Sequence, residues 1–133
     1  MEPTFATEYS VYLSGNQSIE DVGLALGTLF PGAFITTHQN TVEMNLSGWK
    51  LFIRLASDSW VAEEAAEIAQ EADPHLKGRL QRSTRRLELC SSSDDPDKHY
   101  NAKLIAYEAL SYMDGAVGFN SATGDLLANS TSG

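Results

Sequence analysis

The residues best suited to chemistry follow the cysteine at position 90. They are Asp94, Asp95, Asp97 and His99. Together they offer the oxygen and nitrogen ligands that divalent cations take, but the run lacks the glycine and the closing carboxylate of a calcium-binding loop. Asp95 followed by Pro96 is instead typical of a helix start, with an N-cap and then a proline at the first helical position. We therefore interpret the run as a helix cap and predict no metal site and no cofactor.

A second set could supply a nucleophile. Cys90, His99 and Asp94 have the residue types of a thiol, a base and an orienting acid. However, Cys90 ends a predicted strand, where a small apolar residue is usual. It is also the only cysteine, so the chain can form no internal disulfide. We predict that the protein is not an enzyme, and an uncharacterised enzyme is the third alternative.

The residues best suited to binding lie on a predicted helix that begins at Ser57 or Asp58 and ends before Pro74. At 100° per residue its small apolar side chains form one stripe and its glutamates fall in a single opposite arc. A tryptophan shares that arc, and a large amphipathic ring among charges is typical of an interaction surface. The predicted partner-binding residues are Trp60, Glu63, Glu64, Glu67 and Glu71.

A basic island follows this helix. It consists of Lys77, Arg79, Arg82, Arg85 and Arg86. One interpretation is that the island, with Arg79, Arg82 and Arg85 among its members, pairs with the glutamates of the helix across the surface. The other is an anion or nucleotide site, which would make the protein a small-molecule or nucleotide-binding regulatory module using the Arg79–Arg86 segment. No glycine-rich or aromatic motif accompanies the island, so the second interpretation is the alternative.

Length and charge narrow the class of protein. A chain of 133 residues fits one domain, and its formal net charge of -9 disfavours binding to nucleic acid or to an anionic membrane. The same charge favours a basic partner. The first residues, MEPTFATEYSV, lack the basic and apolar regions of a secretory signal, and no run approaches the roughly 18 apolar residues of a membrane span. We expect a cytoplasmic protein.

Patterning predicts the elements in order. Residues 84–115 predict a strand, a capped turn and a long helix at the centre of the fold, and Ser18 with Asp21 predicts a capping box. The other predicted strands are 8–14, 33–37, 41–46, 49–56, 116–119 and 125–127, and the other predicted helices are 18–30, 58–72 and one beginning at Pro74. We predict one α+β domain over residues 1–127, with a mainly antiparallel sheet of five to seven strands and helices packed on one face. Residues 128–133 are predicted to be a disordered tail.

The second half of the chain resembles a known class of proteins. The segment RLELCSSSDDPDKHYNAKLIAYEALSYMDGAVGFNSATGDLL combines a strand, Asp-Asp-Pro-Asp with a following Asn101, a helix, and a hydrophobic hairpin containing Thr-Gly-Asp. In this order it is similar to the small acidic immunity proteins encoded beside bacterial polymorphic or contact-delivered toxins. The resemblance covers about a third of the chain. It implies that the protein binds and neutralises a cognate toxin, and it assigns no binding residue. We expect a monomer or weak homodimer that binds a basic toxin domain.

Overall fold

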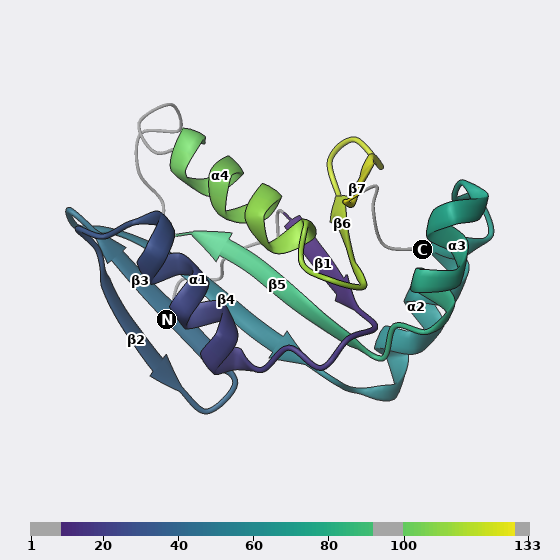
Figure 1. The fold of residues 1–133 in the computed structure, drawn as a ribbon, viewed down its shortest axis with the longest axis horizontal. Helices are drawn as coiled ribbons and strands as arrows, with labels where there is room; N and C mark the ends of the chain where they lie inside the picture. The colour runs from purple at the N-terminus through teal and green to yellow at the C-terminus, as the bar shows by residue number, and fades with distance from the viewer. Residues whose placement is uncertain (1–8, 92–99, 130–133) are drawn as a thin grey trace, which may run out of the picture.

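The computed structural model describes residues 9–91 and 100–129, which form seven strands and four helices (Figure 1). The strands are β1 (Tyr9–Leu13), β2 (Phe34–His38), β3 (Thr41–Leu46), β4 (Trp49–Ala56), β5 (Arg85–Ser91), β6 (Ala116–Asn120) and β7 (Leu126–Leu127). The helices are α1 (Ile19–Leu29), α2 (Ser59–Ala69), α3 (Pro74–Gln81) and α4 (Tyr100–Ser111). The predicted order of strands and helices is confirmed.

One sheet contains all seven strands in the order β2-β3-β4-β5-β1-β6-β7. Every neighbouring pair is antiparallel, which confirms the predicted antiparallel α+β class. The meander β2-β3-β4 joins β5 directly, with Ile53 opposite Leu89. β1 lies between β5 and β6, with Val11 opposite Leu87 on one side and Gly118 on the other. Thus β5 occupies the middle of the sheet, as predicted.

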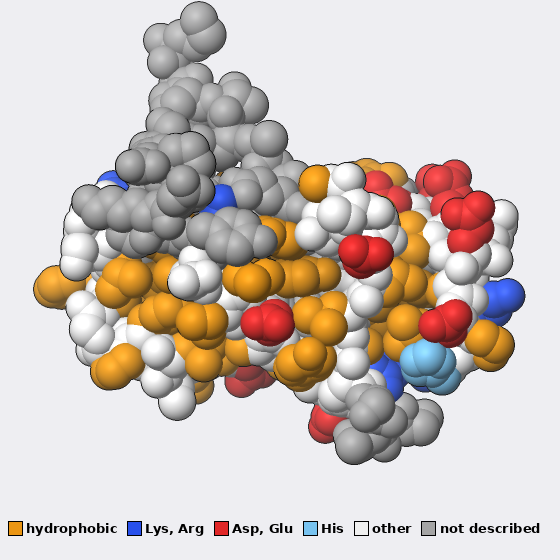
Figure 2. All heavy atoms as spheres, turned by 90° about the horizontal axis from the view of Figure 1, so that it is seen from above, with side chains coloured by type: hydrophobic (Ala, Val, Ile, Leu, Met, Phe, Trp, Pro, Cys, Tyr) orange, Lys and Arg blue, Asp and Glu red, His pale blue; other side chains and the backbone are white. Residues whose placement is uncertain are grey.

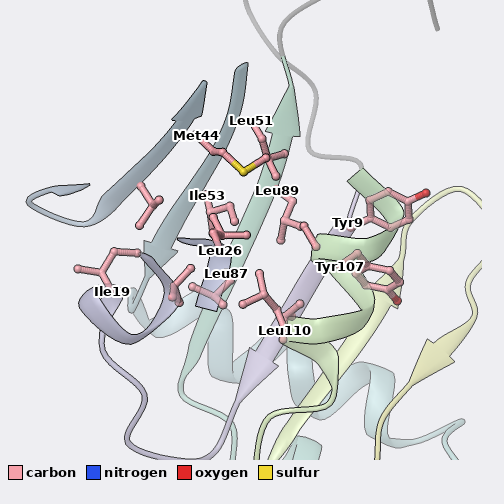
Figure 3. Close-up of a cluster of buried hydrophobic side chains, with 14 of the residues drawn as sticks. Tyr9, Ile19, Leu26, Met44, Leu51, Ile53, Leu87, Leu89, Tyr107 and Leu110 are labelled. Carbon is pink, nitrogen blue, oxygen red and sulfur yellow. The ribbon is translucent and has the colours of Figure 1, made fainter. Parts of the chain in front are cut away.

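The face of the sheet under α1 and α4 is apolar. Leu87 and Leu89 point to this face because side chains alternate along a strand, and they pack with side chains from β1, β3, β4 and both helices (Figure 3). The fully buried members include Val11, Leu26 and Ile53. This single cluster is the main core of the domain.

α1 lies close against the edge of the sheet. It begins at the predicted capping box, in which Ser18 and Asp21 each bond the backbone N–H of the other at 3.1 and 2.9 Å. A Cβ atom at Gly23 would lie 3.0 Å from the Oγ1 atom of Thr37 on β2. The glycine therefore allows the helix to approach this strand.

α4 packs closely on both β1 and β6. Tyr107 stacks on Tyr9, with ring centroids 4.4 Å apart, and Ser111 is buried. A Cβ atom at Gly118 would lie 2.0 Å from the Ser111 Oγ atom and 2.8 Å from Tyr107. Only glycine fits there, because a real Cβ atom never approaches another atom so closely.

α2 and α3 pack on the opposite face of the sheet, so the prediction that the helices share one face is wrong. Tyr12 on β1 and Val117 on β6 point away from the main core. They form a second apolar cluster with Val61, Ala65 and other apolar side chains of α2 and α3. Figure 1 shows α2 and α3 together at one end of the molecule, apart from α1 and α4. The sheet has apolar residues on both faces at β1 and β6, so it needs helices on both.

Two predictions, the helix cap at Asp95 and the tail from Ala128, fall partly or wholly outside the described residues. The proposed Asp95 cap and its Pro96 lie outside the described residues, as do Asp94, Asp97 and His99. The predicted tail begins at Ala128, which packs against α2 and α3, and Asn129 accepts a hydrogen bond from Arg79 at 3.0 Å. These contacts hold the first two residues of that tail against the domain.

Candidate functional site

The predicted acidic face of α2 divides into exposed and engaged residues. Glu63, Glu67 and Glu71 are exposed, while the small side chains of the opposite stripe are buried against the sheet. The two faces of the helix therefore separate in the way its sequence predicts. Trp60 and Glu64 differ from the other three residues because both contact Arg86 of β5.

Glu64 belongs to an ion cluster between α2 and the sheet. Its Oε1 atom accepts hydrogen bonds from the Tyr12 hydroxyl and from Arg86. Arg86 also donates to Glu88, which is buried and lies 3.7 Å from Arg54 at the rim. We use the name ion cluster for Tyr12, Glu64, Arg86 and Glu88. The structure thus places Glu64 in a contact that holds α2 on the sheet.

The ion cluster shifts the pKa values of two of its members. Burial raises the pKa of Tyr12 well above its ordinary value, and the hydrogen bond to Glu64 raises it further. Burial acts against the charge of Arg86, yet hydrogen bonds to Glu88 and Tyr12 and attraction by both carboxylates leave its pKa raised on balance. Tyr12 is therefore a neutral donor and Arg86 a permanent cation at neutral pH.

Trp60 lies over this cation. The Arg86 Cζ atom is 4.6 Å from the centroid of the indole ring, within cation–π distance. The indole Nε1 atom donates to Asp58, the N-cap residue of α2, at 3.2 Å. One side of the ring is thus fixed by the protein, while 38% of the residue stays exposed. A fixed aromatic ring loses little conformational entropy when a partner covers it.

Three arginines of the basic island have different partners in the structure. Arg79 is buried and donates to the carbonyl oxygens of Ala116 at 3.4 Å and Asn129 at 3.0 Å. Arg85 donates to the carbonyl oxygens of Gly15 and Gln17. The ion pair with α2 that the structure shows is made by Arg86, one member of the island. The guanidinium groups of Arg79, Arg85 and Arg86, which the alternative interpretation would combine in one anion site, therefore have separate surroundings.

A groove runs between α2 and the β6–β7 hairpin. It has a volume of about 400 Å³, and its lining residues are Glu67, Ile68, Glu71, Phe119, Gly124 and Leu126. We call this feature the acidic groove. A neighbouring hollow of about 330 Å³ reaches the ion cluster through Ile68 and Phe119, which line both. Figure 2 shows acidic side chains gathered at the end of the molecule that bears α2 and α3, beside a band of hydrophobic ones.

The position of the terminal hairpin beside α2 was not predicted from the sequence. Phe119 and Leu126 pair across β6 and β7, and both are partly buried against the cluster under α2. Gly124 has a φ of 80°, which glycine adopts readily in a turn. The hydrophobic hairpin was visible in the sequence, but its position beside α2 depends on the sheet order and could not be read from local patterns.

The described residues contain no cluster of three or more potential metal ligands. Cys90 is partly buried on β5, and the proposed catalytic partners Asp94 and His99 fall outside the described ranges. His38 is exposed at the end of β2. No helix in the part of the chain that the structure describes is long and apolar enough to cross a membrane.

Comparisons with known proteins found no matching family model, no matching curated protein and no matching solved structure.

Proposed function

We propose that the protein is a non-enzymatic immunity-type protein that binds and neutralises a basic toxin domain through the acidic groove and the adjacent face of α2. The observation that carries the proposal is that this groove combines carboxylates with apolar side chains. Glu67 and Glu71 form a carboxylate rim beside apolar side chains of Ile68, Phe119 and Leu126. A basic protein segment matches both parts, because lysine and arginine have aliphatic stems and charged ends.

The charges and the apolar floor would act on different steps of binding. Carboxylates on a chain of formal charge -9 attract a basic domain and speed its approach. Apolar contact excludes water and slows the departure of the bound partner. The exposed part of Trp60, fixed over Arg86, supplies a further contact at the same helix.

The ion cluster supports this function by holding the binding face in place. Glu64 links α2 to β1 through Tyr12 and to β5 through Arg86. The helix is thus joined to two strands of the sheet, and the exposed glutamates require little ordering when a partner binds. Because Arg86 neutralises Glu64, the carboxylates left for a partner are Glu63 and Glu67 of α2 and Glu71 in the turn that follows it.

The toxin-directed role and the bacterial origin rest on the resemblance of residues 86–127 to immunity proteins, and the cytoplasmic location is an expectation from the sequence. The alternative, a regulatory module that binds a nucleotide with the basic island, has less support. Arg79 and Arg85 donate to backbone carbonyls, and Arg86 is neutralised by two carboxylates. A phosphate would have to displace these internal partners.

Co-expression with the toxic domain encoded by the adjacent gene tests the proposal. The wild-type protein should restore growth, and Glu67→Lys with Glu71→Lys should abolish protection while the chain stays folded. Glu108→Lys on α4 with Asp114→Lys in the turn after it changes the net charge equally and serves as the matched control. Equal protection by both double variants would move the binding face elsewhere, and no binding of the neighbour by wild type would refute the proposal.

A further inference from the structure

The two outer strands of the described sheet differ in their capacity to pair. β7 has two residues, whereas β2 has five and reads FITTH, with no lysine, aspartate, glutamate, arginine or proline. Proteins usually protect an outer strand with charges, prolines, bulges or short length. β7 is protected because it is short, whereas β2 has none of these protective features among its residues.

The register of β2 shows which of its backbone groups face outward. His38 and Thr41 are partners across the two-residue turn, so this closing pair exchanges hydrogen bonds. Alternation then directs the backbone N–H and C=O groups of Ile35 and Thr37 away from β3. The outer edge of β2 therefore offers two donors and two acceptors to a further strand.

An apolar groove of about 570 Å³ follows this edge between β2 and α1. Its lining residues are Glu20, Gly23, Leu24, Gly27, Thr28, Ile35 and Thr37. Leu24 is 72% exposed, and Phe34 on the other side of β2 is 82% exposed. These are the two most exposed large hydrophobic residues in the part of the chain that the structure describes. The edge thus has exposed apolar side chains on both sides.

Gly27 marks a place where another helix could approach. A Cβ atom there would meet nothing within 4 Å, so no internal contact requires glycine. A glycine within a helix costs about 1 kcal/mol relative to alanine. Gly23, one turn away, differs because Thr37 lies close to it.

We infer that β2 pairs antiparallel with β2 of a second copy of this chain, about a two-fold axis at Thr36, with the two α1 helices side by side over the joined sheet. In this register Ile35 of each copy lies opposite Thr37 of the other, and both have outward-facing backbone groups. Phe34 lies opposite His38 on the far face. Leu24 is covered at the contact between the helices, where Gly27 permits close approach.

A second copy fits this edge better than an unrelated strand for two reasons. An antiparallel strand is self-complementary about a two-fold axis, so one surface supplies both halves of the interface. The edge is also nearly uncharged in a chain of formal charge -9, with Glu20 the one charged residue lining the groove. Two acidic copies can therefore meet here with little repulsion.

Sedimentation of the full chain tests the inference. The 14.5 kDa chain should form dimers as its concentration rises. Leu24→Glu should raise the dimer dissociation constant at least about tenfold, by burying a charge at the contact, without lowering the melting temperature of the monomer. Ile105→Glu, at an exposed apolar residue of α4, is the matched control and should dimerise as wild type does. A wild-type chain that stays monomeric at millimolar concentration, or a dimer unaffected by Leu24→Glu, overturns the inference.

A cross-linking experiment tests the register independently. Opposed Thr36 residues form a non-hydrogen-bonded pair, whose Cα atoms lie about 4.5 Å apart, a separation compatible with a disulfide. Thr36→Cys in a Cys90→Ala background should therefore give a disulfide-linked dimer on mild oxidation. Ser47→Cys, in the exposed turn between β3 and β4, is the control. Equal cross-linking at both positions, or binding of a strand from another protein to β2 with no self-association, contradicts pairing with a second copy.

Discussion

The two faces of the sheet are stabilised by different interactions. Under α1 and α4 the strands contribute Val11, Leu87 and Ile53 to one continuous apolar cluster. Under α2 the same strands contribute Tyr12, Arg86 and Glu88, and a smaller apolar cluster lies beside these polar groups. One face is therefore a conventional core, and the other combines apolar contacts with buried charge.

This difference separates the part of the molecule that maintains the fold from the part proposed to bind. Burying charged groups is expensive unless they are paired, so an ion cluster is a poor means of adding stability. It does fix the orientation of a helix, because hydrogen bonds are directional. We therefore attribute to the ion cluster the positioning of α2, Trp60 and the acidic groove.

The largest expected effect comes from Arg86→Ala. Its side chain is 13% exposed, and its removal leaves the Glu64 carboxylate without this cation and the buried Glu88 carboxylate with only the more distant, exposed Arg54. Breaking a buried pair in this way should lower the free energy of unfolding by about 3 kcal/mol. Urea denaturation measures the loss. Arg54→Ala is the matched control, because Arg54 contacts the same Glu88 from a 61% exposed position and should cost less than about 1 kcal/mol. Equal losses would mean that burial of the cluster has no energetic importance.

On the apolar face, Gly118→Ala should be the most disruptive small change. The new methyl group would overlap the side chain of Ser111 and contact Tyr107. We expect a loss of about 1–3 kcal/mol, because α4 must shift away from β6. Thermal melts of this variant and of Gly118→Ala with Ser111→Gly provide the test. If removing the Ser111 side chain restores no stability, the contact is not the cause.

Alkaline pH should weaken the apolar face through Tyr107. Burial raises the pKa of this tyrosine to about 12, whereas an unfolded tyrosine titrates near 10. The folded protein thus keeps the proton where the unfolded chain has lost it. The resulting stability is fully present below about pH 10 and is lost as the pH rises toward 12. Tyr107→Phe should flatten the decline in melting temperature over this interval, and Tyr112→Phe, at an exposed tyrosine, controls for the substitution itself.

The smallest effect is expected on α1. Gly27→Ala should raise the free energy of unfolding of the monomer by up to about 1 kcal/mol, because alanine favours the helix and nothing obstructs its methyl group. Gly23→Ala should gain less or lose stability, since its Cβ atom would lie 3.0 Å from Thr37. Urea denaturation at low protein concentration compares the two. If Gly23→Ala were more stable than Gly27→Ala, the packing described for this helix would be contradicted.

Local patterns predicted the elements well because these depend on nearby residues. The capping box at Ser18 is confirmed. The alternation along β5 is confirmed too, because Leu87 and Leu89 lie in the main core while Arg86 and Glu88 belong to the ion cluster on the other face. Alternation also placed Arg86 and Glu88 on the face of β5 opposite to Leu87 and Leu89. It could not show that α2 covers the face that bears Arg86 and Glu88. The error in helix placement has the same origin, since the contact of Tyr12 with Glu64 joins segments far apart in the chain.

The candidate site was predicted only in part, because local patterns do not show contacts between segments far apart in the chain. Helical periodicity correctly grouped the glutamates of α2, and the structure exposes Glu63, Glu67 and Glu71. Periodicity could not distinguish Glu64, whose engagement depends on Arg86 from a distant strand. Phe119 and Leu126 complete the acidic groove only because β6 pairs with β1 and brings the hairpin to α2. Their place beside α2 could not be predicted from local patterns, and their role as part of a binding face is a proposal.

Binding kinetics at two salt concentrations test the central claim most directly. The toxic domain that the proposal places in the adjacent gene is purified and immobilised. Wild type is then compared with Glu67→Lys/Glu71→Lys and with the control Glu108→Lys/Asp114→Lys. Steered association falls with ionic strength. We predict that the α2 variant associates at least about tenfold more slowly at low salt and shows a flatter salt dependence, with the control close to wild type. Equal association rates for both variants would contradict a binding role for the acidic groove.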